Sequence, residues 1–263
     1  MPFLKLFRQL LYDYSSIARE AKNFPGTYFG NYFKLTIDKT IKTIGYIWHY
    51  LFRNKKYDKK LETVGNYKII SDYINKDSII YSCGIAENIS FDTKISNKFK
   101  CEVFMFDPTK NSLRLMNSIN DPKLKFFNIG VWTLDGNIKF YHTDDADHGN
   151  MSATNLFNSK NYVTLPCKSI LTLMKEHHHN KIDVLKMDIE GASFEVLNDL
   201  IDKRIYPKQI IVELERPFFI FNANFSEIYS YLIKRVRLHK KLRKVGYDLI
   251  ELQANELLAI KFN

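Results

Sequence analysis

The feature that most constrains the fold is an alternation of short apolar, β-rich runs with helical segments, which starts at about residue 64. Such alternation is typical of α/β domains, because each helix returns the chain to the start of the next parallel strand. It predicts a mostly parallel sheet covered by helices on both faces. The predicted strands are SIIYSC (78–83), EVFMFD (102–107), LKFFNIGVW (124–132), KIDVLKMD (181–188) and QIIVELE (209–215).

Two further stretches depart from the parallel pattern. The alternating run GNIKFYHT (136–143) begins within LDGN (134–137), a hairpin signal, and is expected to pair with 124–132 or with a neighbouring strand. The final run YDLIELQANELLAIKF (247–262) is expected to form an antiparallel hairpin. Helices are predicted at 88–99, 108–119, 169–177, 194–202 and 225–245.

The excess positive charge divides the chain into two parts. Residues 1–60 hold 12 Lys and Arg against 4 Asp and Glu, a balance of +8, whereas 61–263 hold 27 against 25, a balance of +2. Apolar residues at helical spacing on both sides of NFPG (23–26) predict two helices in the first part. We therefore expect a basic helical segment at 1–60 and one domain at 61–263. The segment would pack on the domain or a second subunit, or bind an anionic membrane surface.

The remaining composition favours a cytoplasmic enzyme or binding protein. No run of 18 apolar residues occurs, so a membrane-spanning helix is not expected. The three cysteines are odd in number and form no CxxC pair, which is typical of reduced, buried thiols.

Two strand ends carry residues that suit a nucleoside ligand. Gly84 follows the first strand, where a glycine turn lets backbone approach a ligand, but no GxGxxG follows, which argues against a dinucleotide. Asp107 ends the second strand and would either bind ribose hydroxyls or cap the helix after Pro108. A ribose-binding acid without a pyrophosphate loop fits S-adenosylmethionine.

The stretch DVLKMDIEG (183–191) places two acids and a glycine after a buried strand. The acids either cap the next helix or face a ligand at the carboxyl end of the strand. Glu213 and Glu215 end the next strand on the same side, and they reach a substrate or pair with basic residues. Lys186 inside the strand has no assigned partner.

The stretch VLKMDIEGASFEVL (184–197) resembles the signature of the FkbM-type S-adenosylmethionine-dependent methyltransferases, and IIYSCGIAENISFD and EVFMFDPT also match that family. The resemblance covers roughly residues 64 to 262 and implies a Rossmann-like class I methyltransferase fold. Ala86 stands where class I members often carry another glycine. Ser193 replaces a residue that is frequently acidic or small, so it has no assigned role.

The resemblance also implies roles for individual residues. Asp188 and Glu190 would lie by the sulfonium and the acceptor, and Asp188 would count among the cofactor contacts. The other implied cofactor contacts are Ser82, Gly84 and Glu87 at the methionine part, Asp107 and Pro108 at the ribose, and Asn128 and Gly130 near the adenine.

The predicted reaction is methylation of a hydroxyl on a sugar, a glycan precursor or a small metabolite. An alcohol acceptor needs a base, for which Glu190, Asp188 and His148 are the candidates. Asp144, Asp145 and Asp147 with Asp188 could bind a divalent metal, but solvated loop acids are the commoner case and no metal site is assigned.

The acceptor could be anionic or linked to a lipid or nucleotide phosphate, and a homo-oligomer is compatible with the sequence. The alternatives are an RNA-binding or RNA-methylating protein that uses the basic segment, and a non-catalytic scaffold that binds the cofactor. Nucleic acid is the less favoured partner, since the charge lies outside the domain and no RNP1-like motif occurs.

Overall fold

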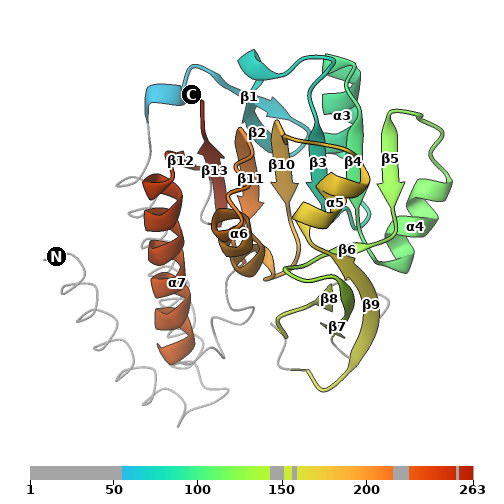
Figure 1. The fold of residues 1–263 in the computed structure, drawn as a ribbon, viewed down its shortest axis with the longest axis vertical. Coiled ribbons are helices and arrows are strands. Elements are labelled where there is room, and N and C mark those ends of the chain that lie inside the picture. The colour runs from blue at the N-terminus through green and yellow to red at the C-terminus, as the bar shows by residue number, and fades with distance from the viewer. Residues whose placement is uncertain (1–54, 143–150, 156–158, 216–224, 253–254, 263) are drawn as a thin grey trace, which may run out of the picture.

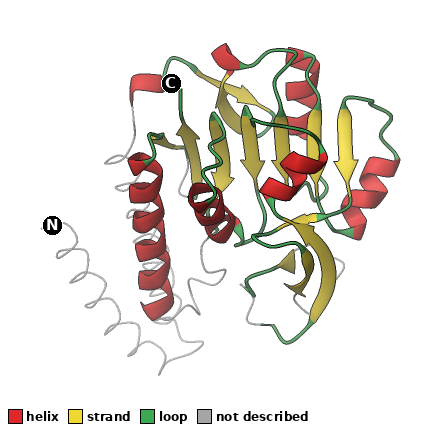
Figure 2. Ribbon diagram, viewed as in Figure 1, coloured by secondary structure: helices red, strands yellow, loops and turns green. Residues whose placement is uncertain are grey.

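The computed structural model describes residues 55–142, 151–155, 159–215, 225–252 and 255–262. A seven-stranded sheet with the order β12-β13-β11-β10-β3-β4-β5 forms its centre, and Figure 2 shows these strands side by side among the helices. Its strands are β3 (Ile80–Cys83), β4 (Val103–Phe106), β5 (Leu124–Phe127), β10 (Val184–Met187), β11 (Gln209–Glu213), β12 (Asp248–Glu251) and β13 (Glu256–Ile260).

Strand directions confirm the predicted mixture of parallel and antiparallel pairing. β11, β10, β3, β4 and β5 run parallel to one another, whereas β13 is antiparallel to both β11 and β12. The helices between them are α3 (Ser90–Phe99), α4 (Lys110–Asn117), α5 (Ile170–Glu176), α6 (Ser193–Asp202) and α7 (Phe225–Lys244). Among the described residues, no helix is both long enough and apolar enough to cross a membrane.

Two hydrophobic clusters form the core, one on each face of the sheet. Tyr81 and Cys83 of β3 pack with residues of α5, α6 and α7 on one face. Ile80 of the same strand packs with residues of α3 and α4 on the other face. Successive side chains of a strand point to opposite faces, so strands buried on both sides need apolar residues at nearly every position. This requirement explains the continuous apolar runs of the sequence.

A hairpin that the sequence analysis did not predict precedes the central sheet. It consists of β1 (Leu61–Val64) and β2 (Tyr67–Ile70), which are antiparallel and joined by a tight turn. Gly65 in this turn has a φ of +60°, and a Cβ there would lie 2.5 Å from backbone atoms of Phe91 in α3. Gln209 of β11 exchanges two hydrogen bonds with the backbone of Ile70, at 2.9 and 2.8 Å. The hairpin is therefore anchored both to α3 and to the central sheet.

A second, four-stranded sheet has the order β6-β9-β7-β8. Figure 1 shows it beyond the carboxyl ends of the central parallel strands. Its strands are β6 (Gly130–Val131), β7 (Gly136–His142), β8 (Met151–Ser152) and β9 (Tyr162–Lys168).

This sheet corrects one prediction and settles another. The run 124–132 is not one strand: after β5 the chain turns at Asn128, whose side-chain amide donates to the backbone oxygens of Asp107 and Thr109 at 2.9 and 3.2 Å, and β6 then joins the second sheet. Of the two pairings left open for 136–143, the structure shows the one with a neighbouring strand: β7 pairs with β8 and β9, and β9 lies between β6 and β7.

Candidate active site

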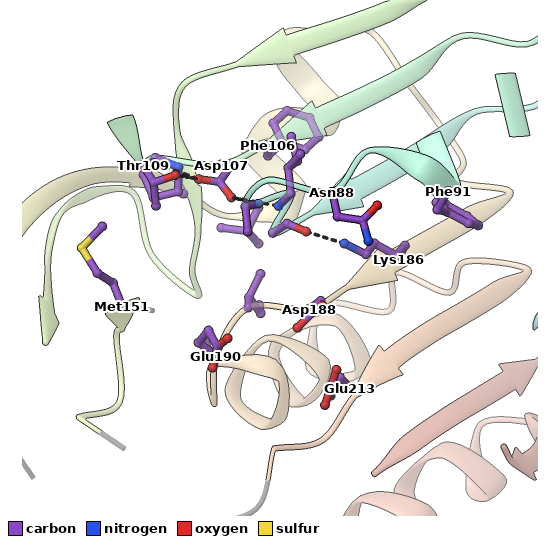
Figure 3. Close-up of a pocket in the computed structure, with 18 of the residues that line it drawn as sticks. Asn88, Phe91, Phe106, Asp107, Thr109, Met151, Lys186, Asp188, Glu190 and Glu213 are labelled. Carbon is purple, nitrogen blue, oxygen red and sulfur yellow. Dashed lines mark hydrogen bonds between the residues drawn. The ribbon is translucent and has the colours of Figure 1, made fainter. Parts of the chain in front are cut away.

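A cavity of about 360 Å³ lies where the carboxyl ends of β3, β4 and β10 meet. Tyr67 of the hairpin, Phe140 of β7 and Met151 of β8 add walls from outside the central sheet. Figure 3 shows Asp107 and Thr109 on one side of the cavity, with Asp188, Glu190 and Glu213 on the other. This position agrees with the rule that open α/β sheets bind ligands outside the carboxyl ends of their strands.

The loops after β3 and β10 are in direct contact at the cavity. The Gly84 amide donates to the Phe106 carbonyl, and the Asp188 amide donates to the Cys83 carbonyl, each at 3.0 Å. Gly84 has a φ of +78°, and a Cβ at this position would lie 1.7 Å from the backbone oxygen of Asp188. Only glycine fits here, which explains its presence after β3 in terms of packing as well as backbone conformation.

Asp107 is 4% exposed and organises the loop after β3. Its Oδ2 accepts hydrogen bonds from the backbone amides of Ile85 and Ala86, at 2.8 and 3.1 Å. Its Oδ1 accepts from the amide and the hydroxyl of Thr109, at 2.8 and 2.6 Å. A carboxylate offers about four acceptor positions, so ribose hydroxyls would have to displace one of these donors. The alternative role for Asp107, as the cap of the next helix, is not observed, because the side chain of Thr109 caps α4.

Asp188 and Lys186 face the cavity from the end of β10. The Tyr67 hydroxyl donates to Asp188 Oδ2 at 2.9 Å. Lys186, which had no predicted partner, is 3% exposed; its ammonium donates to the Gly84 carbonyl and lies 5.3 Å from the centroid of the Tyr67 ring. Burial raises the pKa of Asp92 beneath this lysine, and the lysine charge partly offsets the effect. The lysine therefore links the two loops that border the cavity.

Glu190 lies in a strained turn at the cavity wall. Its φ of +46° is in the left-handed region, and Gly191 continues that conformation with a φ of +84°. The Ser152 hydroxyl of β8 donates to the Glu190 backbone oxygen at 2.6 Å. Burial, followed by the charges of Asp188 and Glu213, raises the pKa of Glu190 to about 7. Left-handed non-glycine residues cost of order 1–3 kcal/mol and persist where surrounding contacts hold them.

Two more acids line the cavity, Glu213 and Glu256, which are direct partners in the antiparallel pair β11–β13. Together with Asp188 and Glu190 they form the acidic wall of the cavity. The side-chain amide of Asn255 donates to Glu213. Burial, together with the charges of Glu213 and Asp188, raises the pKa of Glu256 to about 7. Glu215 lies beyond the cavity lining, and burial raises its pKa to about 8. Like charges opposite each other on a sheet are destabilising, so this wall favours a cationic ligand.

Five of the predicted cofactor contacts line the cavity: Gly84, Asp107, Pro108, Gly130 and Asp188. Glu190 lines it as well. Three do not: Ser82 is fully buried in β3, the exposed Glu87 bonds to Asn111, and the Asn128 amide bonds to the backbone beside Asp107. The predicted base His148 and the acids Asp144, Asp145 and Asp147 lie outside the described residues. Within the described part of the chain, His, Cys, Asp and Glu side chains form no cluster suited to a metal ion.

Sequence reasoning missed Tyr67, Glu256, Phe140 and Met151, which line the cavity. Tyr67 precedes the first predicted strand (78–83), and the others come from strands with antiparallel partners, some of which are remote in sequence. The one available signal was the alternation of 136–143, which predicts a strand but not its neighbour.

The cavity suits S-adenosylmethionine by its donor set. Carboxylates from the loop after β10 and from the strand pair β11–β13 line one side, as a sulfonium and an ammonium group require. Ile85, Val131, Phe140 and Met151 offer apolar surface elsewhere in the lining. Asp107 and Thr109 provide polar atoms between these regions, although the carboxylate is already fully hydrogen-bonded. By the assignment that the signature implies, Asp188 and Glu190 would lie at the sulfonium, and Gly84 would lie at the methionine part of the cofactor.

An open, mostly parallel sheet that ends in an antiparallel hairpin, with its cavity at the carboxyl ends of the strands, defines the class I methyltransferase fold. Residues 66–249 match the family described as "Methyltransferase FkbM domain". The chain belongs to this family, as the stretch VLKMDIEGASFEVL indicates.

Similarity to individual proteins is lower. A human protein named "Probable methyltransferase-like protein 24" is 29% identical over 143 residues, which are 53% of this chain and 33% of that protein. The chain thus spans about a third of the length of this curated relative. Two solved structures share 13% identity: a Methanococcus jannaschii fibrillarin pre-rRNA processing protein (TM-score 0.37, 79% of this chain and 84% of that chain) and an Aeropyrum pernix fibrillarin in complex with S-adenosyl-L-methionine (TM-score 0.32, 71% and 66%).

Proposed function

We propose that this protein transfers a methyl group from S-adenosylmethionine to a hydroxyl of a small polar acceptor, with Glu190 as the general base. The observation that carries this proposal is the position of Glu190: a half-buried carboxyl in the cavity wall, beside Asp188, with its pKa raised to about 7. A base works best when its pKa lies near the operating pH.

S-adenosylmethionine, when bound, supplies a methyl group on a cationic sulfur, and the acceptor oxygen must lose a proton as it takes that methyl. Glu190 in its ionised form would receive the proton. Asp188 would face the cationic end of the cofactor. Most of the rate of such an in-line displacement comes from alignment of donor and acceptor, and the contact between the Gly84 and Asp188 loops supports a fixed geometry for both.

The acceptor class is part of the proposal. A hydroxyl on a sugar, a glycan precursor or a small metabolite would need the base that Glu190 offers, and the cavity of about 360 Å³ is at the small end of the range for ligand pockets. A protein that binds the cofactor without turnover is the competing outcome, which the experiments separate.

The first experiment measures binding of S-adenosylmethionine and S-adenosylhomocysteine to the full chain by calorimetry. Both are expected to bind, and absence of binding of either would overturn the cofactor assignment. The second experiment measures S-adenosylhomocysteine formation with a panel of sugars, sugar nucleotides and small alcohols.

The matched variants are Glu190→Gln and Glu176→Gln. We expect the first to lower turnover by about 100-fold or more, the usual contribution of a general base, while S-adenosylmethionine still binds. Glu176 pairs with Lys168 on the surface, away from the cavity, and its variant should retain full turnover. Equal turnover of Glu190→Gln and the native chain would exclude Glu190 as the base.

A further inference from the structure

Tyr67 lies in the β1–β2 hairpin, outside the central sheet, yet it contacts both loops at the cavity. It begins β2, and its hydroxyl donates to Asp188 Oδ2 at 2.9 Å. The ammonium of Lys186, which holds the Gly84 carbonyl, lies 5.3 Å from the centroid of its ring. One side chain of the hairpin therefore contacts the acidic loop after β10 directly and the glycine loop after β3 through a lysine.

The position of Tyr67 is set by rigid contacts. Its ring packs edge-on against Phe91 of α3, with ring centroids 5.5 Å apart. The turn before Tyr67 packs closely against α3 at Gly65, and Ile70 at the end of its strand is hydrogen-bonded to Gln209. A side chain held from three directions keeps its orientation at low entropic cost when a ligand binds.

The negative charges of the acidic wall indicate what the Tyr67 hydroxyl does for Asp188. Asp188 shares the cavity with the carboxyl groups of Glu190, Glu213 and Glu256, and its charge contributes to the raised pKa values of Glu190 and Glu256. A hydrogen bond to a charged group contributes about 1.5–3 kcal/mol. Burial, followed by the Asp188 charge, raises the pKa of Tyr67 above its usual value, so the hydroxyl remains a donor at neutral pH.

We propose that Tyr67 is a positioning residue that holds Asp188 as an oriented carboxylate against the cationic sulfur of the methyl donor. This inference rests on the proposed function, and it assigns the β1–β2 hairpin a role in cofactor binding. Its specific consequence concerns charge: Tyr67 should favour the sulfonium form of the cofactor over the neutral, demethylated form.

The test measures the dissociation constants of S-adenosylmethionine and S-adenosylhomocysteine for Tyr67→Phe, which keeps the ring and its packing. We expect affinity for S-adenosylmethionine to fall about ten-fold, the equivalent of one charged hydrogen bond, with affinity for S-adenosylhomocysteine nearly unchanged. A merely structural role would weaken both ligands equally, and either that result or two unchanged affinities would overturn the inference.

Tyr57→Phe is the matched control. Tyr57 is buried and also donates to an aspartate, Asp248, at 2.6 Å, but it lies outside the cavity lining. This variant should leave the ratio of the two affinities at the native value. Asp188→Asn, which removes the charge that Tyr67 orients, should lower affinity for S-adenosylmethionine at least as much as Tyr67→Phe. The double variant should be little weaker than Asp188→Asn alone, because Tyr67 acts through that carboxylate. Failure of the native chain to bind either ligand would instead count against the proposed function.

Discussion

At the scale of single residues, the acids after β10 differ in their surroundings and hence in their roles. Asp188 has a fixed donor in Tyr67, whereas no hydroxyl or ammonium donor is seen for the Glu190 side chain in the described structure. Active sites use one carboxyl group for charge stabilisation and another for proton transfer by placing the two in different environments. The pairing of a supported Asp188 with a destabilised Glu190 is the basis for assigning them different tasks.

The pH dependence of turnover follows from Glu190. A general base must be ionised, and its pKa is raised to about 7, so kcat/KM should rise with pH up to about 7 and then level off. A profile measured with an accepted hydroxyl substrate that stays flat from pH 5 to pH 8 would contradict this assignment.

A second residue-scale expectation concerns Glu256 in the free protein. Its folded pKa of about 7 exceeds the usual value of 4.5, so stability is lost as pH rises through the interval between them. Glu256→Gln should therefore raise the thermal midpoint relative to the native chain more at pH 8 than at pH 5.5. Thermal unfolding of both proteins at the two pH values checks this, and an equal or reversed difference would refute it.

At the scale of elements, the sequence predicted what is local and missed what is remote. Apolar runs and the spacing of Gly84, Asp107 and Asp188 predicted the central strands and three residues of the cavity, because burial on both faces leaves a continuous apolar signal. The two-residue strands β6 and β8 carry no such signal. Tyr67 was missed because nothing local in a short hairpin reveals which side chain its tertiary contacts direct into a cavity.

The hairpin should be sensitive to its anchor. Gln209 is 1% exposed, and Gln209→Ala would leave the buried amide and carbonyl of Ile70 without partners, at about 1–3 kcal/mol for each group. Denaturant unfolding should show a lower midpoint, and binding of S-adenosylmethionine should weaken as Tyr67 loses its support. Asn198→Ala, which removes a surface amide bonded to Lys241, should change neither.

At the scale of the whole molecule, the cavity is assembled by three structural units. The central sheet provides Gly84, Asp107 and the acids after β10; the hairpin provides Tyr67; and the second sheet provides Phe140 and Met151. The mostly parallel sheet with its final antiparallel hairpin was predicted from the sequence, whereas the order of the strands in that sheet was not. The way in which the two small units close the cavity follows from contacts between segments remote in sequence, which no single stretch encodes.

The hydrogen bond from Ser152 to the backbone of Glu190 ties the second sheet to the strained turn that carries the candidate base. An attempt to redirect this protein to another acceptor by exchanging the segment from β7 to β9 would therefore alter more than the shape of the pocket. Without a hydroxyl at position 152, the turn at Glu190 would lose an outside support for its left-handed conformation. An exchange of this segment that changes the accepted substrates would thus also affect proton transfer by Glu190, unless the inserted segment keeps a serine at position 152.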